Sequence, residues 1–265
     1  MTLVGLLVAA ALTAPSPAPA VDGAAVARSA APAEMAAIPA GKYERLHGGS
    51  HSMAEVGRFA IDRTPVTRAD YVAFVTHNST WRKSSVATPG YLADWSSDLD
   101  AGNTVPVRAP VTSVSWHAAA AYCKSVGKRL PTVDEWEYVA AASETKKNAV
   151  RDRTFINRLV SLYAARSTGA QLPVGTGFRN VYGVRDLHDR AWEWTADFKP
   201  LPSAHAHHDH HDMKGHKHTM SCASSAIGAA DPSNYPAFMR SAVRAGLDHK
   251  STMTTLGFRC AVTLS

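Results

Sequence analysis

The stretch Val114–Cys123 has the sequence VSWHAAAAYC, and the prediction of the fold starts from it. Alanine has the highest helix propensity and serine is a preferred N-terminal cap, so we predict a helix over Trp116–Val126 that is capped by Ser115. Gly127 suits the end of this helix. The helical repeat directs Cys123 toward the core.

Further secondary-structure signals lie on both sides of this helix. Thr67–Asp70 and Thr132–Glu135 are capping boxes, each of which predicts the start of a helix. We expect another helix over Arg153–Arg166 and a closing strand around Gly257–Val262. The β-branched segment Val111–Val114 is predicted to form a short strand. Because turn signals are dense and the helices are few and short, the predicted fold class is an α+β domain with much irregular structure.

The composition is typical of a globular protein. The 265 residues are 45% hydrophobic and 19% charged, which excludes a disordered or fibrous chain. The apolar run Leu3–Leu12 is shorter than the roughly 20 residues of a membrane-spanning helix, so we expect no integral membrane contact. The net charge is +6, but lysines and arginines are scattered among acidic residues instead of forming one stripe, so nucleic-acid binding is not expected.

The N-terminus has the features of an export signal. We predict a signal peptide at residues 1–20, because Leu3–Leu12 forms an apolar h-region and Ala18-Pro19-Ala20 offers a cleavage site. Residues 21–37 form an Ala/Pro-rich tether, and the globular domain is expected over residues 38–265. The predicted location is periplasmic or secreted, where disulfides persist. The alternative is a disordered cytosolic N-terminus.

Seven of the thirteen histidines lie in one tract at residues 205–218. Imidazole ligates copper, zinc and nickel, and most of these rings are unprotonated near neutral pH, so we predict a His-rich loop that captures metal. The tract does not distinguish among these metals, and a solvated loop without a role is the alternative. The predicted ligands are His205, His207, His208, His210, His211, His216 and His218.

A set of short motifs extends along the chain: Val114–Cys123, Gly127–Thr132, Glu135–Tyr138, Asn180–Gly183, Asp186–His188, Trp192–Thr195 and Leu256–Ala261. In this order they resemble the signature of the formylglycine-generating enzyme (sulfatase-modifying factor) family. The resemblance implies a compact, irregular α+β domain related to C-type lectin folds. It also implies a disulfide between Cys123 and Cys260, which match the family's structural pair.

The resemblance implies copper chemistry as well. Oxidases of this family convert a substrate cysteine to formylglycine with O₂ and a copper ion that is held by two cysteines. Here Cys222 occupies the first of those positions, whereas Ile227 and Gly228 stand where the second cysteine would follow. The stretch Cys222–Arg240 resembles a branch of formylglycine-generating-enzyme-like proteins associated with copper nitrite reductases. This implies a client protein, such as a copper nitrite reductase, as the partner.

Cys222 is the candidate catalytic residue and the central copper ligand. A thiolate is a soft ligand that suits Cu(I), and thioether or imidazole groups complete such sites. Met220, His218 and His216 lie within six residues of Cys222, so the chain allows a shared site. The alternative is a buried, inert cysteine.

Two further sets of residues carry expectations from the resemblance. Arg240 and Arg244 match a basic segment of the family and either line the cleft or lie on the surface. Calcium is the second implied cofactor, but Arg190 is a poor neighbour for a divalent cation, so structural packing is the favoured role of its candidate ligands. Those ligands are Asn180, Asp186, Asp189 and Glu193. His117 has no visible partner in the sequence and is assigned no role.

Three functions remain open, and the sequence leaves undecided whether the chain is an enzyme. The leading hypothesis is an exported copper-associated accessory protein that binds Cu(I) near Cys222 and acts on, or supplies metal to, a client copper enzyme. The second is a copper- and O₂-dependent oxidase that converts a protein cysteine to formylglycine. The third is a non-catalytic, lectin-like binding module.

Overall fold

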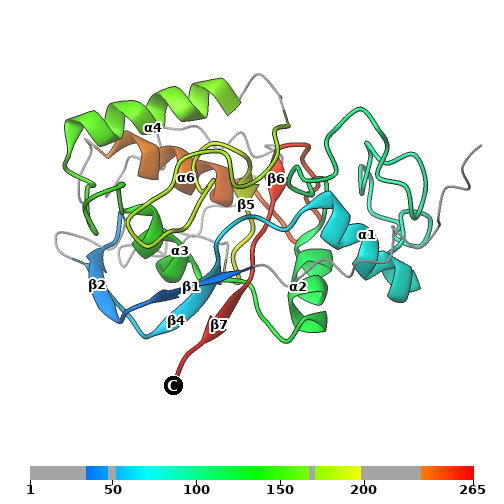
Figure 1. The fold of residues 1–265 in the computed structure, drawn as a ribbon, viewed down its shortest axis with the longest axis horizontal. Helices are drawn as coiled ribbons and strands as arrows, with labels where there is room; N and C mark the ends of the chain where they lie inside the picture. Colours follow the sequence, from blue (N-terminus) through cyan, green and yellow to red (C-terminus); the bar gives the residue numbers. More distant parts are fainter. Residues whose placement is uncertain (1–33, 47–51, 167–170, 198–233) are drawn as a thin grey trace, which may run out of the picture.

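The computed structural model describes residues 34–46, 52–166, 171–197 and 234–265 (Figure 1). Helices and strands alternate with long irregular connections, which confirms the predicted α+β class. The strands are β1 (Met35–Ile38), β2 (Gly41–Glu44), β3 (Met53–Val56), β4 (Phe59–Asp62), β5 (Trp192–Glu193), β6 (Leu256–Gly257) and β7 (Ala261–Thr263). The helices are α1 (Arg68–His77), the short 3₁₀ helix η2 (Ser79–Trp81), α2 (Trp116–Ser125), α3 (Val133–Ala140), α4 (Arg153–Arg166) and α6 (Tyr235–Ala245).

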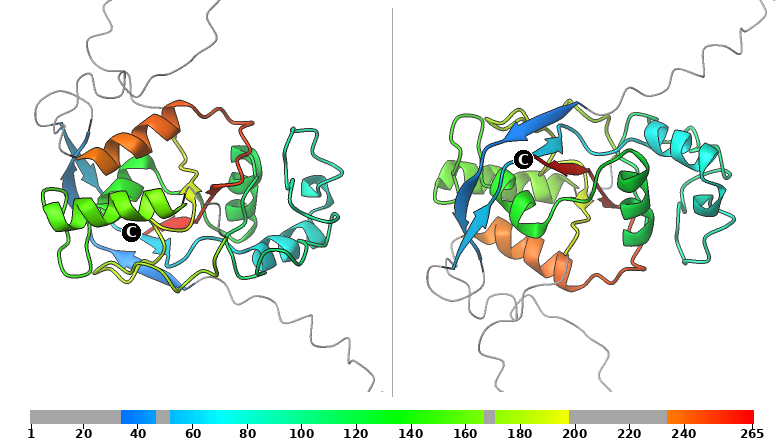
Figure 2. Two further views of the ribbon diagram at one scale, coloured as in Figure 1. Left: turned by 90° about the horizontal axis from the view of Figure 1, so that it is seen from above. Right: turned by 90° about the horizontal axis from the view of Figure 1, so that it is seen from below.

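The central sheet is antiparallel and has the strand order β1-β4-β7. It therefore joins the beginning and the end of the described chain on either side of β4. β2 and β3 form a separate antiparallel pair, and β5 pairs with β6 in parallel. Helices α3, α4 and α6 lie on one side of the domain, and α1 and α2 lie on the other (Figures 1 and 2). The predicted closing strand is split into β6 and β7, so the last segment contributes to two sheets.

The folded domain begins before the predicted boundary. β1 starts at Met35, inside the range 21–37 that the sequence assigned to the tether. Ala36 and Ile38 alternate with more exposed residues and are buried in the core, and the whole strand pairs with β4. Residues 1–20, the predicted signal peptide, lie outside the described residues.

The local helix signals are confirmed. Thr67–Asp70 and Thr132–Glu135 form reciprocal capping boxes at α1 and α3, and Ser115 accepts a hydrogen bond from a backbone N–H of α2. α4 has the bounds predicted for it. Gly127 follows α2 with a φ of +71°, a conformation that favours glycine.

Val111–Val114 does not form a strand, so this prediction was wrong. Ser113 has a φ of +57°, and this left-handed conformation interrupts the extended chain. The backbone of the segment bonds to separate partners instead: Val111 N–H donates to Val66, and Ser113 N–H donates to Met253.

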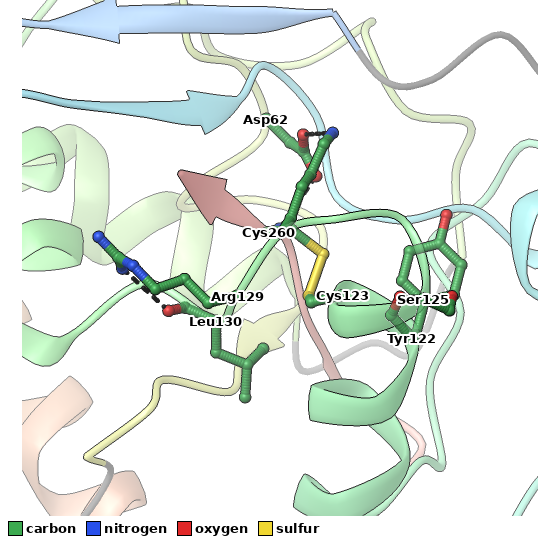
Figure 3. The surroundings of a disulfide bond; sticks show 8 residues. Asp62, Tyr122, Cys123, Ser125, Arg129, Leu130 and Cys260 are labelled. Carbon is green, nitrogen blue, oxygen red and sulfur yellow. Dashed lines mark hydrogen bonds and ion pairs between the residues drawn. A yellow bond between two sulfur atoms is a disulfide. The ribbon is translucent and has the colours of Figure 1, made fainter. Parts of the chain in front are cut away.

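A disulfide joins Cys123 in α2 to Cys260 before β7, as the family resemblance implied (Figure 3). Both cysteines are fully buried. The N–H of Cys260 donates to the Asp62 carboxylate, which also pairs with Lys128. The bond therefore fastens α2 to the central sheet. Separately, none of the helices in the described ranges has the length and apolar character needed to cross a bilayer.

Replacing the disulfide is expected to lower the free energy of unfolding strongly. Cys123→Ser or Cys260→Ser should cost about 5 kcal/mol by the chain-entropy model, because the disulfide closes a loop between residues 137 positions apart. Urea unfolding followed by circular dichroism measures this loss. Cys222→Ser is the matched control and should keep the parental stability. Thiol titration of the denatured, oxidised parent should find one free thiol, and three free thiols would contradict the pairing.

Candidate functional site

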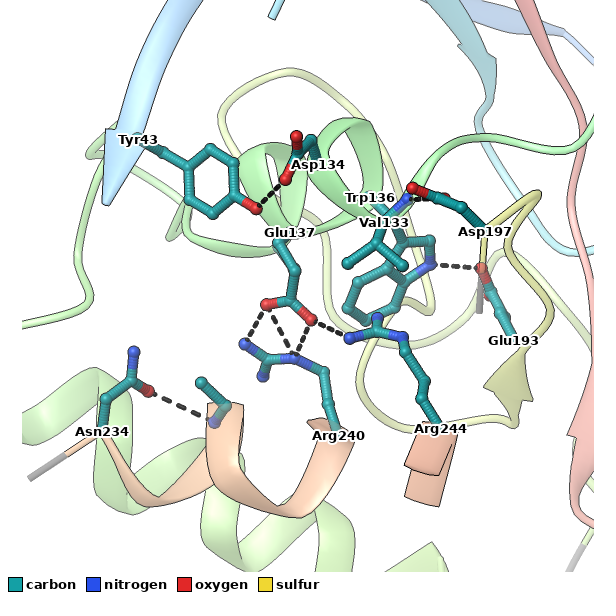
Figure 4. A network of polar contacts seen from close by, with 12 residues as sticks. Tyr43, Val133, Asp134, Trp136, Glu137, Glu193, Asp197, Asn234, Arg240 and Arg244 are labelled. Atoms are coloured by element: carbon teal, nitrogen blue, oxygen red, sulfur yellow. Dashed lines mark hydrogen bonds and ion pairs between the residues drawn. The ribbon is translucent and has the colours of Figure 1, made fainter. Parts of the chain in front are cut away.

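Arg240 and Arg244 lie one turn apart in α6 and point toward the same carboxylate, Glu137 of α3 (Figure 4). The Asn234 side chain accepts a hydrogen bond from Ala237 N–H and caps the helix, and Pro236 occupies its first turn. Because residues four apart share one face of a helix, the capped start of α6 fixes where both guanidinium groups emerge.

The contacts of Glu137 are short and largely buried. Arg240 donates to it through Nε at 2.9 Å and through Nη2 at 2.6 Å, and Arg244 donates through Nη1 at 2.5 Å. The side chains of Arg240 and Glu137 are 5% and 14% exposed. Burial alone would raise the pKa of Glu137, but the two guanidinium groups hold it at about 2. Burial likewise opposes the charge on Arg240, whereas Glu137 raises the pKa of that arginine.

Trp136 lies beneath both arginines. Its ring centroid is 5.6 Å from Cζ of Arg240 and 5.1 Å from Cζ of Arg244, within range of a cation–π interaction. Its indole N–H donates to Glu193 at 2.8 Å, and Glu193 in turn pairs with the fully buried Arg259. The tryptophan is therefore held in place by the ion pair beneath it.

These side chains surround a small recess. Its free volume is about 10 Å³, roughly the space of one water molecule. Its described wall combines two guanidinium groups with aromatic and aliphatic surface, and the Glu193 carboxylate in it is already paired with Arg259. The lining residues are Trp136, Trp192, Glu193, Arg240, Val243, Arg244, Leu247 and Leu256.

A hydrogen-bonded chain continues from Arg240 into the core. Its Nη1 donates to Tyr163 Oη at 2.8 Å, and this hydroxyl lies 3.0 Å from His188 Nδ1. His188 is fully buried, and its Nε2 lies 3.2 Å from the carbonyl oxygen of Ala140. Since that carbonyl can only accept, Nε2 carries the proton and Nδ1 accepts from Tyr163. The arginine is thus anchored on two sides, by α3 and by α4.

Sequence reasoning did not identify Glu137, Tyr163 or His188 as parts of this cluster. The available signal was the four-residue spacing of Arg240 and Arg244, which predicts that two cations share one helix face and need a common counter-ion. Which acidic residue fulfils that need is decided by tertiary structure, since Glu137 lies 103 residues away from Arg240.

Each of the four candidate calcium ligands has a partner in the protein, although Asp189 is engaged through Oδ2 and its buried Oδ1 has no hydrogen-bond partner among the described residues. Asn180 Oδ1 accepts two backbone N–H bonds, and Glu193 pairs with Arg259. Asp186 and Asp189 lie close together, but Arg190 occupies the position beside them, with Nη1 3.2 Å from Asp189 Oδ2. Burial and the neighbouring Asp186 raise the pKa of Asp189, while Arg190 opposes that shift. A guanidinium group thus supplies positive charge at the place where calcium was considered.

The predicted copper ligands lie outside the described residues, between Asp197 and Asn234. They comprise Cys222, Met220 and the histidines of the 205–218 tract. The two ends of this segment flank the Glu137 cluster (Figure 4). Asp197 accepts a hydrogen bond from Val133 N–H at the start of α3, and Asn234 caps α6. Within the described ranges, no three His, Cys, Asp or Glu side chains converge to hold a metal ion.

Comparison with known proteins agrees with this architecture. Residues 22–264 match the model of the sulfatase-modifying factor enzyme 1-like domain. The chain therefore belongs to the formylglycine-generating enzyme–sulfatase (FGE-sulfatase) family.

Its relatives include proteins named as formylglycine-generating enzymes and proteins named as inactive ones. The chain is 28% identical over 281 residues to the inactive C-alpha-formylglycine-generating enzyme 2 of Bos taurus, covering 86% of this chain and 87% of that protein. It is 29% identical over 209 residues to the formylglycine-generating enzyme of Mycobacterium tuberculosis, covering 68% and 66%. Among solved structures, CarF aligns with a TM-score of 0.49 and 19% identity, covering 88% of this chain and 99% of CarF. Family membership alone therefore does not decide activity.

Removing the charge of Glu137 is expected to destabilise the domain. Glu137→Gln should lower the free energy of unfolding by roughly 3–5 kcal/mol, because two largely buried guanidinium groups lose their counter-ion. The folded-state pKa of about 2 lies below the ordinary 4.5, so this contribution is present above pH 4.5 and is lost as the pH falls toward 2. Urea unfolding at several pH values measures both effects.

Glu55→Gln provides the matched control for this variant. Glu55 pairs with Lys42 on the surface, with side chains 76% and 62% exposed, so Glu55→Gln should leave the free energy of unfolding almost unchanged. Equal losses of unfolding free energy in Glu137→Gln and Glu55→Gln would show that the buried cluster stabilises the domain no more than a surface ion pair does.

Proposed function

We propose that the chain is an exported, copper-associated accessory protein that binds Cu(I) through Cys222 and supplies metal to, or acts on, a client copper enzyme. The disulfide is the observation that carries the proposal. The chain has three cysteines, and the disulfide uses Cys123 and Cys260. Cys222 is therefore the one thiol left, and a copper ion held by two thiolates of the same chain cannot form.

A single thiolate supports metal transfer better than oxidation. A Cu(I) ion on one thiolate, with thioether or imidazole as further ligands, lacks the two-sulfur geometry of the family's oxidases. We therefore expect weak or no O₂ activation. The lack of a second thiolate ligand also makes the ion easier to transfer to a client such as a copper nitrite reductase.

The described recess supplies no copper ligand of its own. The described residues that line it include no thiolate, thioether or imidazole, and Glu193 is paired with Arg259. Cys222, Met220 and His218 would hold the ion instead.

Export is part of the same proposal. A periplasmic or secreted location rests on the predicted signal at residues 1–20, and the disulfide supports it because such bonds persist in oxidising compartments. Calcium is not needed in this proposal, since Arg190 provides the positive charge beside Asp186 and Asp189.

The oxidase is the second candidate, and the relatives named as formylglycine-generating enzymes favour it. It would require Cys222 to generate formylglycine with substituted ligands. The two functions differ in turnover: an oxidase consumes O₂ with a cysteine peptide, whereas an accessory protein transfers copper without turnover.

Copper titration of Cys222→Ser tests the proposal. We expect the parent to bind one Cu(I) tightly in competition with a chromophoric chelator, to lose that ion in the variant, and to form no aldehyde from a sulfatase-type cysteine peptide under O₂. Met253→Leu, at an exposed methionine elsewhere in the chain, is the control and should bind copper as the parent does. Robust aldehyde formation that is lost in Cys222→Ser would establish the oxidase, and tight Cu(I) binding that survives in the variant would exclude both functions.

Deleting residues 205–218 is expected to remove several weakly bound copper or zinc ions. Uptake by the parent should collapse as the pH falls through roughly 6, because protonated imidazole cannot ligate metal. The domain should still fold, since Met213 is the one apolar side chain of appreciable size in the tract. Metal analysis after dialysis and a thermal melt measure the two effects. A variant that fails to fold would show that the tract belongs to the core.

A further inference from the structure

Two exposed histidines from distant parts of the chain meet on the surface. His117 is the second residue of α2, and His249 lies in the turn that follows α6. Their ring centroids are 5.1 Å apart, and the ring planes meet at 72°. The partner that the sequence did not reveal for His117 is therefore a second imidazole.

The backbone that carries each ring is held by local hydrogen bonds. The Ser115 side chain caps the first turn of α2, and the indole of Trp116 packs edge-on against His117 at 5.3 Å. On the other side, Asp248 closes a turn by accepting the N–H of Lys250 at 2.7 Å and that of Ser251 at 3.0 Å. The pair is thus largely arranged before any ligand arrives, which lowers the entropic cost of binding.

The spacing of the rings matches shared coordination of one ion. A metal–nitrogen distance of about 2.0–2.1 Å places an imidazole centroid about 3.2 Å from the metal. Two such rings at a tetrahedral angle then have centroids about 5 Å apart, and the observed separation is 5.1 Å. Within the described residues, no hydrogen bond engages either ring, so the nitrogen lone pairs are not already committed to the protein.

The geometry points to a two-imidazole site, formed by His117 and His249, for one divalent transition-metal ion of the Cu²⁺, Ni²⁺ or Zn²⁺ class. Imidazole suits these ions, and water completes the coordination because both side chains face solvent. This site uses neither Cys222 nor the His-rich tract, so it does not depend on the function proposed above.

The test counts the Zn²⁺ ions bound to a full-length parent in which the other candidate metal ligands have been replaced. The parent carries Asn in place of the seven tract histidines, His47 and His51, and Ser in place of Cys222, and its fold is checked by circular dichroism. Equilibrium dialysis with metal analysis should find one Zn²⁺ per chain. His117→Ala and His249→Ala should each abolish this ion, and the double variant should lose nothing more.

His77→Ala is the matched control, because His77 is an exposed histidine in the last turn of α1 and should leave the ion in place. Cu²⁺ provides a second readout, since it quenches nearby indole fluorescence. Quenching of Trp116 should disappear in His117→Ala and should persist in His77→Ala. A parent that binds no Zn²⁺, or an ion that survives in either single variant, would overturn the inference.

Discussion

The guanidinium group of Arg259 is completely buried, and much of the domain is arranged around it. It donates to both oxygens of Glu193 at 2.7 and 2.8 Å, and to the carbonyl oxygens of Asp62 and Arg185 at 2.9 Å each. A buried charge without partners costs several kcal/mol, so Arg259 can be enclosed only when β4, β5 and the Arg185 loop are all in place. The adjacent Cys260 adds the covalent link to α2. A short C-terminal segment thus unites parts of the chain that are far apart in sequence.

The same ion pair determines the geometry of the recess. Glu193 accepts the indole N–H of Trp136, and Arg240 and Arg244 lie over that ring while they bind Glu137. The position of α6 therefore follows from a chain of contacts that begins at Arg259. On its other side, Arg240 reaches Tyr163, which fastens α6 to α4. These contacts all lie within the described residues.

The sequence could predict those features of the fold that depend on residues close together in the chain. The capping boxes at Thr67–Asp70 and Thr132–Glu135 involve side chains three residues apart, so the helices they start were evident. The disulfide was predicted because Cys123 and Cys260 match the structural cysteine pair of the family. Ser113 escaped prediction because its left-handed conformation is imposed by hydrogen bonds to distant segments. The pairing of Glu137 with Arg240 escaped it too, because each residue is an ordinary surface charge until α3 and α6 meet.

Within the described residues, several buried carboxylates pair with the protein's own cations, although Asp186 and Asp189 share the single guanidinium group of Arg190. Arg259 neutralises Glu193, Arg240 and Arg244 neutralise Glu137, and Arg190 lies beside Asp186 and Asp189. Where ligand residues are arranged only by a metal, the binding free energy becomes folding free energy, and release of the ion unfolds the domain. In the parts that the structure describes, the frame is held together by ion pairs among the protein's own residues. The proposed accessory function requires such a frame, because an ion that is transferred to a client must leave while the core of the domain stays intact.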